Sequence, residues 1–222
     1  MSKKTPSQSS SCYEQNCTAC PRLADFLAGV RDTYPTYFAY PVAPFGPVKA
    51  RFMVVGLAPG LHGANRTGRP FTGDWCGPLL YSSLHKYGFA NQAESVARDD
   101  GLQMLDCRVT NAVKCLPPEN KPTPAEIREC NHFLKNEIDL IQPQIILALG
   151  SIAHQAVVQA QALKKSAYPF GHHAVHTLPS GATLIDSYHV SRYNTQTKRL
   201  TEAMFHAVLA DVRARLDGVG KP

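Results

Sequence analysis

Four short apolar runs alternate along this chain with longer segments of helical periodicity. The runs lie at Arg51–Val55, Arg108–Val113, Gln144–Leu149 and Thr183–Tyr188. Each has the length of a buried strand, and strands that alternate with helices are typical of a parallel sheet covered on both faces. We therefore expect an α/β fold with three layers, α/β/α, around a central, mainly parallel four-stranded sheet.

Helix boundaries are visible between these runs. Thr123-Pro-Ala-Glu126 is a capping box with proline at the first helical position, so a helix is predicted to begin there. We expect Ser151 to cap the next helix, from Ile152 to about Leu163. The last helix is predicted to run from about Thr197 to Leu216.

The chain of 222 residues is long enough for one domain with a substantial core. We expect a disordered, polar and basic tail over residues 1–11 and a single domain over residues 12–222. The sequence has no apolar run of 18 residues and no apolar signal segment at its N-terminus, so we expect a cytoplasmic protein that does not bind membranes. Its formal net charge of +6 suits a polyanionic partner, although charge alone does not identify one.

The stretch after the first apolar run is rich in glycine. Residues 56–74 read GLAPGLHGANRTGRPFTGD and contain five glycines and a single carboxylate, Asp74. Glycine lets a backbone approach a ligand closely, and α/β sheets bind ligands at the carboxyl ends of their strands. We interpret the loop as a ligand cradle in which Arg66 and Arg69 offer charge to a polyanion and Phe71 offers a flat face. The alternative is a surface loop that is glycine-rich by chance.

Seven cysteines in a chain without an export signal favour metal ligation over disulfides. Cys17 and Cys20 form a Cys-x-x-Cys pair, while Cys115 follows the second apolar run and Cys130 lies in the capped helix. Four thiolates suit either a zinc ion or an iron–sulfur cluster, and the spacing does not choose between them. Two unrelated buried pairs are the alternative. The remaining cysteines are expected to be free thiols, the first of them a competing ligand: Cys12, Cys76 and Cys107.

A second group of polar residues follows the fourth apolar run. His189 comes directly after it, and Ser191 with the following backbone amides offers a phosphate site. Arg192 and Tyr193 are expected to project from a tight turn, where a wedge could enter a base stack. Asn111 belongs to the same sheet edge, and its amide suits reading the edge of a base. A structural histidine and an asparagine that staples a neighbouring loop are the alternatives.

Residues 164–180 are predicted to form an irregular basic loop that leads into a hairpin before the last strand. Its three histidines match no structural zinc pattern. We interpret them as solvated groups near a phosphate path: His172, His173 and His176.

Five motifs carry a resemblance to a known family. They are CTACPR at 17–22, GLAPG at 56–60, HGANRTGRPFTGD at 62–74, TNAVKCLPPENKPTP at 110–124 and YHVSRYNTQT at 188–197. Together they resemble the uracil-DNA glycosylase superfamily, specifically its family 5, over most of the chain. Leu57 stands where the related family 4 has a glutamate, and Val190 stands where it has a proline.

The resemblance implies a DNA repair enzyme, a monofunctional uracil-DNA glycosylase with a [4Fe–4S] cluster held by the four thiolates. Such an enzyme hydrolyses the N-glycosidic bond of uracil in double- or single-stranded DNA and leaves an abasic site. Other deaminated bases such as hypoxanthine are implied as further substrates. We expect the protein to be a monomer.

The resemblance also implies roles for individual residues. Asp74 aligns with the proposed catalytic carboxylate, and His189 aligns with the histidine that hydrogen-bonds the leaving base. The usual acid of the first motif is absent from residues 57–60, which moves the catalytic expectation to Asp74. A water held by the backbone of Ala58 and Pro59 is the alternative. The full set of expected substrate-binding residues is Gly56, Ala58, Phe71, Asn111, Ser191 and Arg192.

Two other functions are weighed against this one. A non-catalytic DNA-binding protein with a structural metal site would carry the same fold and cysteines. A phosphate-ester hydrolase that uses the glycine-rich loop is less favoured, because no Walker lysine and no acidic metal cluster accompany the loop.

Overall fold

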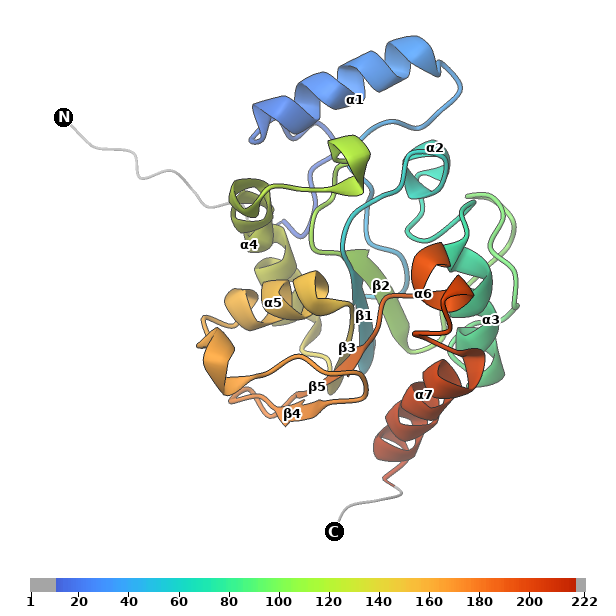
Figure 1. Ribbon diagram of the computed structural model, residues 1–222, viewed down its shortest axis with the longest axis vertical. Coiled ribbons are helices and arrows are strands. Elements are labelled where there is room, and N and C mark those ends of the chain that lie inside the picture. The colour runs from blue at the N-terminus through green and yellow to red at the C-terminus, as the bar shows by residue number, and fades with distance from the viewer. Residues whose placement is uncertain (1–10, 219–222) are drawn as a thin grey trace, which may run out of the picture.

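A five-stranded sheet forms the centre of the computed structural model, which describes residues 11–218. The strands lie in the order β2-β1-β3-β5-β4 (Figure 1). β1 pairs in parallel with β2 and β3, and β3 pairs in parallel with β5. The expected α/β fold with a mainly parallel sheet is confirmed. The strands are β1 Phe52–Gly56, β2 Cys107–Asn111, β3 Ile145–Leu149, β4 Val175–Thr177 and β5 Thr183–Ser187.

The sheet has one strand more than the four that we expected. β4 is antiparallel to β5 and forms with it the hairpin expected before the last strand. It has three residues, all at least partly exposed at the sheet edge. A strand of this kind lacks the apolar run by which buried strands are recognised.

Helices cover both faces of this sheet. α4 and α5 pack on one face, and α3 and α7 pack on the other (Figure 1). α1 packs instead against the segment after β2 and the start of α4. No helix among the described residues is long and apolar enough to cross a membrane. The helices are α1 Pro21–Thr33, α2 Ala64–Thr67, α3 Cys76–Lys86, α4 Pro124–Ile141, α5 Ser151–Ala160, α6 Arg192–Gln196 and α7 Glu202–Leu216, with 3₁₀ turns at Pro118–Asn120 and Lys165–Ala167.

The strand order brings the glycine-rich loop to a switch point of the sheet. β1 lies between β2 and β3, so the chain continues to one side of β1 and later to the other. Ligands of α/β proteins bind outside the carboxyl ends of the strands at such a point. Gly56 and Asn111 end their strands opposite one another at this edge, and Gly150 and His189 follow two neighbouring strands.

The helix starts confirm some of the predictions and correct others. Thr123 and Glu126 form the predicted capping box at α4. Ser151 is the first residue of α5 rather than its cap, because Gly150 occupies the cap position with a φ of 95°. The last helix begins at Glu202 rather than at about Thr197, since Thr201 caps α7 by accepting a hydrogen bond from the Met204 amide. The short helix α6 lies before the predicted range. The predicted tail covers residues 1–11, of which 1–10 lie outside the described residues.

The histidines of residues 164–180 are not the solvated groups that we expected. His172 stacks on Tyr188 and accepts a hydrogen bond from its amide over 3.2 Å. His173 lies 3.2 Å from the carboxylate of Asp211. His176 lies 3.0 Å from a backbone carbonyl and near a buried carboxylate. These contacts tie the loop to β5 and α7, which sequence spacing does not reveal.

A buried ion pair joins α5 to β5 below this loop. His154 Nδ1 lies 2.8 Å from Asp186 Oδ1, and His154 Nε2 lies 2.8 Å from the carbonyl of Tyr168. Both ring nitrogens face acceptors, which favours the doubly protonated ring. Burial lowers the pKa of His154, but the hydrogen bond and charge of Asp186 outweigh it and the pKa is raised.

We expect Asp186→Asn to lower the free energy of unfolding by about 1.5–3 kcal/mol at pH 5.5. A histidine whose pKa is raised by folding contributes stability that is complete below its unfolded pKa of about 6.5. That stability is lost as the pH rises through the folded pKa of His154. Urea unfolding of both proteins from pH 5.5 to 9 should therefore show a gap that narrows with pH. A gap that stays constant would contradict the charged pair.

Candidate functional site

Gly56, the last residue of β1, forms the floor of the candidate site. A Cβ built on Gly56 would lie 2.3 Å from Phe71 Cζ and 2.5 Å from Asn111 Oδ1. Both side chains therefore lie directly over the end of β1, where any larger residue would displace them. The structure brings these three predicted site residues together.

Phe71 is held over this floor in an unusual backbone conformation. Its φ is 53°, a left-handed value that non-glycine residues rarely adopt. Its ring is buried, and the ring centroid lies 6.4 Å from that of His189 at an interplanar angle of 36°. The start of α3 packs against the same turn, since a Cβ on Gly77 would lie 2.3 Å from the Phe71 carbonyl oxygen. Strain of this kind is often found at functional sites.

His189 reaches the site from the segment after β5. Asn194 donates a hydrogen bond to its carbonyl over 2.8 Å, and Gly150 packs against its Cβ. Within residues 11–218, no side chain or backbone group hydrogen-bonds to the imidazole. Burial lowers the pKa of His189 to about 4, so the ring is neutral at pH 7 and carries one N–H donor.

Asn111 contributes an unused acceptor. Its Oδ1 is buried and has no hydrogen-bond partner among the described residues. A buried polar atom without a partner costs free energy comparable to a lost hydrogen bond. A ligand N–H at this position would recover that loss.

Asp74 lies at the rim, next to the first turn of the glycine-rich loop. Its Oδ1 accepts a hydrogen bond from the Cys76 amide over 2.9 Å, so the side chain caps α3. Its Oδ2 occupies the space beside Gly63, where a Cβ would lie 2.1 Å away. Burial raises the pKa of Asp74, and the amides of Cys76 and Gly77 oppose that rise. Oδ1 of Asp74 thus has a structural role at the start of α3, and Oδ2 faces the glycine-rich loop.

Asn120 lies near the same turn and was missed by sequence reasoning. A Cβ on Gly60 would lie 3.4 Å from Asp74 Oδ2 and 3.9 Å from Asn120 Oδ1, so the two side chains flank this glycine. Asn120 adopts a φ of 57° at the end of the 3₁₀ turn Pro118–Asn120. Asparagine tolerates this region better than most residues, and that preference is the one sequence signal that could have singled it out.

The other predicted substrate-binding residues contact parts of the protein other than Phe71 and Asn111. Ser191 caps α6: its hydroxyl oxygen accepts a hydrogen bond from the Asn194 amide over 3.3 Å, and the hydroxyl proton keeps its capacity to donate. The guanidinium of Arg192 lies over the ring of Trp75, 5.3 Å from its centroid. Ala58 packs against the apolar cluster around α1 rather than beside Phe71.

Of the two arginines of the glycine-rich loop, Arg69 does not offer the free charge that we expected, whereas Arg66 is exposed and its charge meets only neutral carbonyls. Arg69 is buried and pairs with Asp100 at 2.9 Å, which is why it cannot meet a polyanion. Arg66 donates to the carbonyls of His62 and Gly73 and thereby staples the loop.

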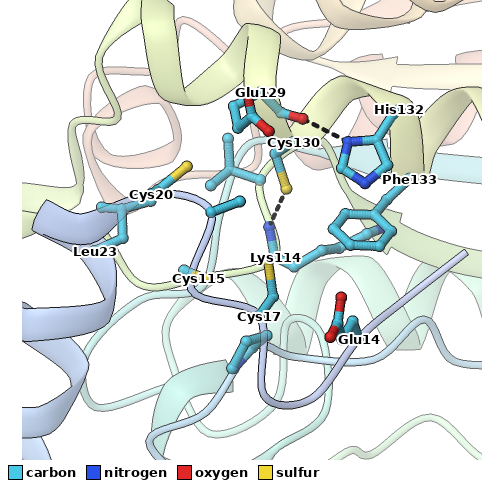
Figure 2. Close-up of a pocket in the computed structure, with 13 residues that line it drawn as sticks. Glu14, Cys17, Cys20, Leu23, Lys114, Cys115, Glu129, Cys130, His132 and Phe133 are labelled. Atoms are coloured by element: carbon cyan, nitrogen blue, oxygen red, sulfur yellow. Dashed lines mark hydrogen bonds between the residues drawn. The ribbon is translucent and has the colours of Figure 1, made fainter. Parts of the chain in front are cut away.

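Four thiols lie around a cavity in another part of the fold. Cys17 and Cys20 precede α1, Cys115 follows β2, and Cys130 lies in α4, and all four line the same cavity (Figure 2). The amide of Lys114 donates to Cys130 Sγ over 3.4 Å. Burial and then the neighbouring Cys130 raise the pKa of Cys20 to about 11. The raised pKa reflects the repulsion that ionised sulfurs would experience here, and a positively charged occupant would relieve that repulsion.

The other three cysteines lie outside this cavity. Within residues 11–218 none of them lines it, and Cys107 is buried in β2. The predicted set of four is therefore the set that the fold brings together.

Comparisons with known proteins bear directly on this arrangement. The profile of the Uracil DNA glycosylase superfamily matches residues 43–213, which include the whole sheet edge described above. The chain belongs to this superfamily. It is 46% identical over 209 residues to the type-5 uracil-DNA glycosylase of Thermus thermophilus, which covers 91% of this chain and 94% of the relative.

Further relatives agree with the assignment. The type-5 uracil-DNA glycosylase of Pyrobaculum aerophilum is 39% identical and covers 87% of this chain and 86% of its own. The type-4 uracil-DNA glycosylase of Thermotoga maritima is 38% identical but covers only 49% of each chain. This chain is therefore similar to the type-5 enzymes over most of its length and to the type-4 enzyme over about half of it, in agreement with its motifs.

Proposed function

We propose that this superfamily member hydrolyses the N-glycosidic bond of uracil in DNA and leaves an abasic site. The observation that carries the proposal is the group of side chains at Gly56: the flat ring of Phe71, the unpartnered acceptor of Asn111 and, next to the ring, the neutral imidazole of His189. A flipped base presents a flat face and a hydrogen-bonding edge, which these groups match. The names of the type-5 relatives support uracil as the base.

Each group has a defined task in this reaction. Phe71 stacks on the flipped base, and Asn111 Oδ1 accepts its ring N–H. His189, as a neutral donor, stabilises the negative charge that develops on the base oxygen as the bond breaks. Because the pKa of His189 is low, the ring is neutral at pH 7 and donates a hydrogen bond to the base without carrying a positive charge.

Asp74 acts on the sugar side of the bond. Its carboxylate stabilises the developing positive charge on the sugar and orients or deprotonates the attacking water. The raised pKa of Asp74 improves it as a base, while the bond from the Cys76 amide fixes its orientation. Asn120, across Gly60, is placed to hold the same water.

DNA is the proposed partner, in double- or single-stranded form, and the protein is proposed to act as a monomer. Hypoxanthine and other deaminated bases are proposed as further substrates. An oligonucleotide with one uracil opposite guanine tests the reaction. Strand breaks that need alkali after incubation support a glycosylase, breaks without alkali indicate a nuclease or lyase, and intact strands after alkali indicate a binding protein.

We further propose that the four thiolates hold a [4Fe–4S] cluster rather than zinc. Four sulfurs bound to one zinc at about 2.3 Å lie about 3.8 Å apart. Within the described part of the chain, the group of three or more potential ligands found within 4.8 Å is His154, His176 and Asp186, not the cysteines. The thiols thus lie further apart than one zinc requires. When bound, such a cluster would tie the segment before α1 to the start of α4.

We expect the purified protein to be brown and to contain about four irons per chain. Cys115→Ser and Cys130→Ser should each lose most of the iron, whereas Cys12→Ser should retain it. Metal analysis together with the visible absorbance measures this directly. A colourless protein with one zinc, or equal iron loss in Cys12→Ser, would refute the assignment.

A further inference from the structure

Two segments far apart in the sequence meet at the rim of the candidate site. Trp75 directly follows Asp74, and its Nε1 donates a hydrogen bond to Thr195 Oγ1 in α6 over 3.0 Å. The guanidinium of Arg192 lies over the same indole. Figure 1 shows α6 beside the start of α3. Trp75 thus joins the segment that carries Asp74 to the segment that carries His189.

This contact leaves much of the indole free. Trp75 is 53% exposed and the nearby Tyr193 is 70% exposed, although large aromatic residues usually bury most of their surface. An exposed aromatic beside an arginine matches the surfaces that bind single nucleic-acid strands, where rings stack on bases and cations meet phosphates. The net charge of +6 is complementary to DNA.

We propose that Trp75 stacks on a base of the DNA strand next to the excised nucleotide. The proposal rests on the proposed function, because a base leaves the stack only when the enzyme flips one out, and its neighbours then lose a stacking partner. Arg192 occupies one face of the indole, and the opposite face receives the base. The hydrogen bond from Trp75 Nε1 to Thr195 Oγ1 fixes the orientation of the indole.

The chain contains one tryptophan, so its fluorescence reports on this residue alone. We expect DNA that carries a stable abasic-site analogue to quench the emission of the intact protein and to shield the indole from acrylamide. Emission and acrylamide accessibility that stay unchanged at saturating DNA would overturn the proposal.

Variants separate stacking from a merely structural contact. Trp75→Ala should weaken binding of the abasic-analogue DNA about 5- to 150-fold, whereas Trp75→Phe should retain most of the affinity because it keeps an aromatic face. Thr195→Val removes the indole hydrogen bond, together with the bonds from Thr195 Oγ1 to the carbonyls of Ser191 and Arg192, but keeps the indole; it should change the affinity no more than about twofold. A loss of affinity in Thr195→Val as large as in Trp75→Ala, with equal melting temperatures, would assign Trp75 a structural role and contradict stacking.

The outcome is distinguishable from failure of the proposed function. Uracil release by the unaltered protein tests the reaction, whereas quenching by the abasic analogue tests the contact. Quenching without uracil release would refute the reaction and retain the contact. Uracil release without quenching would support the reaction and refute the contact between Trp75 and DNA.

Discussion

Asp74→Asn is expected to slow uracil excision about 10²–10⁴-fold, the range for removal of a positioned acid–base group. The reason is the loss of the carboxylate charge at the rim, where it would face the sugar and the attacking water. Single-turnover rates on a duplex with one uracil measure the effect. DNA affinity should change little, because Asp74 carries no positive charge for phosphate.

The asparagine variant is the matched control for helix capping. Its amide oxygen can still accept the hydrogen bond from the Cys76 amide, so α3 keeps its cap. Asp74→Ala loses that bond as well and should cost about 1 kcal/mol of stability in addition. Near-normal excision by Asp74→Asn would remove Asp74 from the catalytic role and favour a water held elsewhere in the loop.

His189→Ala is expected to slow the same step about 10²–10³-fold, as removal of one donor to a developing negative charge typically does. Because burial lowers the pKa of His189 to about 4, the ring is neutral from pH 5.5 to 8.5. The factor by which the variant is slower should therefore be constant over that range. His189→Gln keeps an N–H donor and should recover part of the rate. A defect that grows sharply below pH 7 would indicate a charged histidine instead.

The sequence predicts the framework of the site well, because the framework rests on local signals. The apolar runs, the glycine-rich loop and the capping box at Thr123 mark where strands and α4 begin and end. Gly56, Asn111 and His189 follow from their position at strand ends, since the carboxyl ends of parallel strands share one edge. The four cysteines that line one cavity were grouped from the Cys-x-x-Cys spacing and from the proline-rich connection between Cys115 and Cys130.

What the sequence could not predict depends on contacts between distant segments. Arg69 was expected to face a polyanion, but it pairs with Asp100, 31 positions away, on the buried side of the loop. Asp186 lies in an apolar run, and its partner His154 lies on another element. No periodicity encodes such pairings.

The helix ends also include features that the sequence does not reveal. Ser151 has the composition of a cap, yet Gly150 takes that position because its φ of 95° suits the tight turn beside His189. The break before Thr201 is invisible in the apolar pattern, which continues through Leu200 and Met204. A local hydrogen bond, not hydrophobicity, determines where α7 starts.

The proposed reaction of the site at Gly56 is the release of a base from DNA by hydrolysis. The most direct measurement is the amount of free uracil liberated from a duplex with one uracil, compared with the number of alkali-labile sites formed in the same sample. We expect one free uracil for each alkali-labile site, with both reduced together in Asp74→Asn. Bound DNA without free uracil, or strand breaks that appear without alkali, would contradict it.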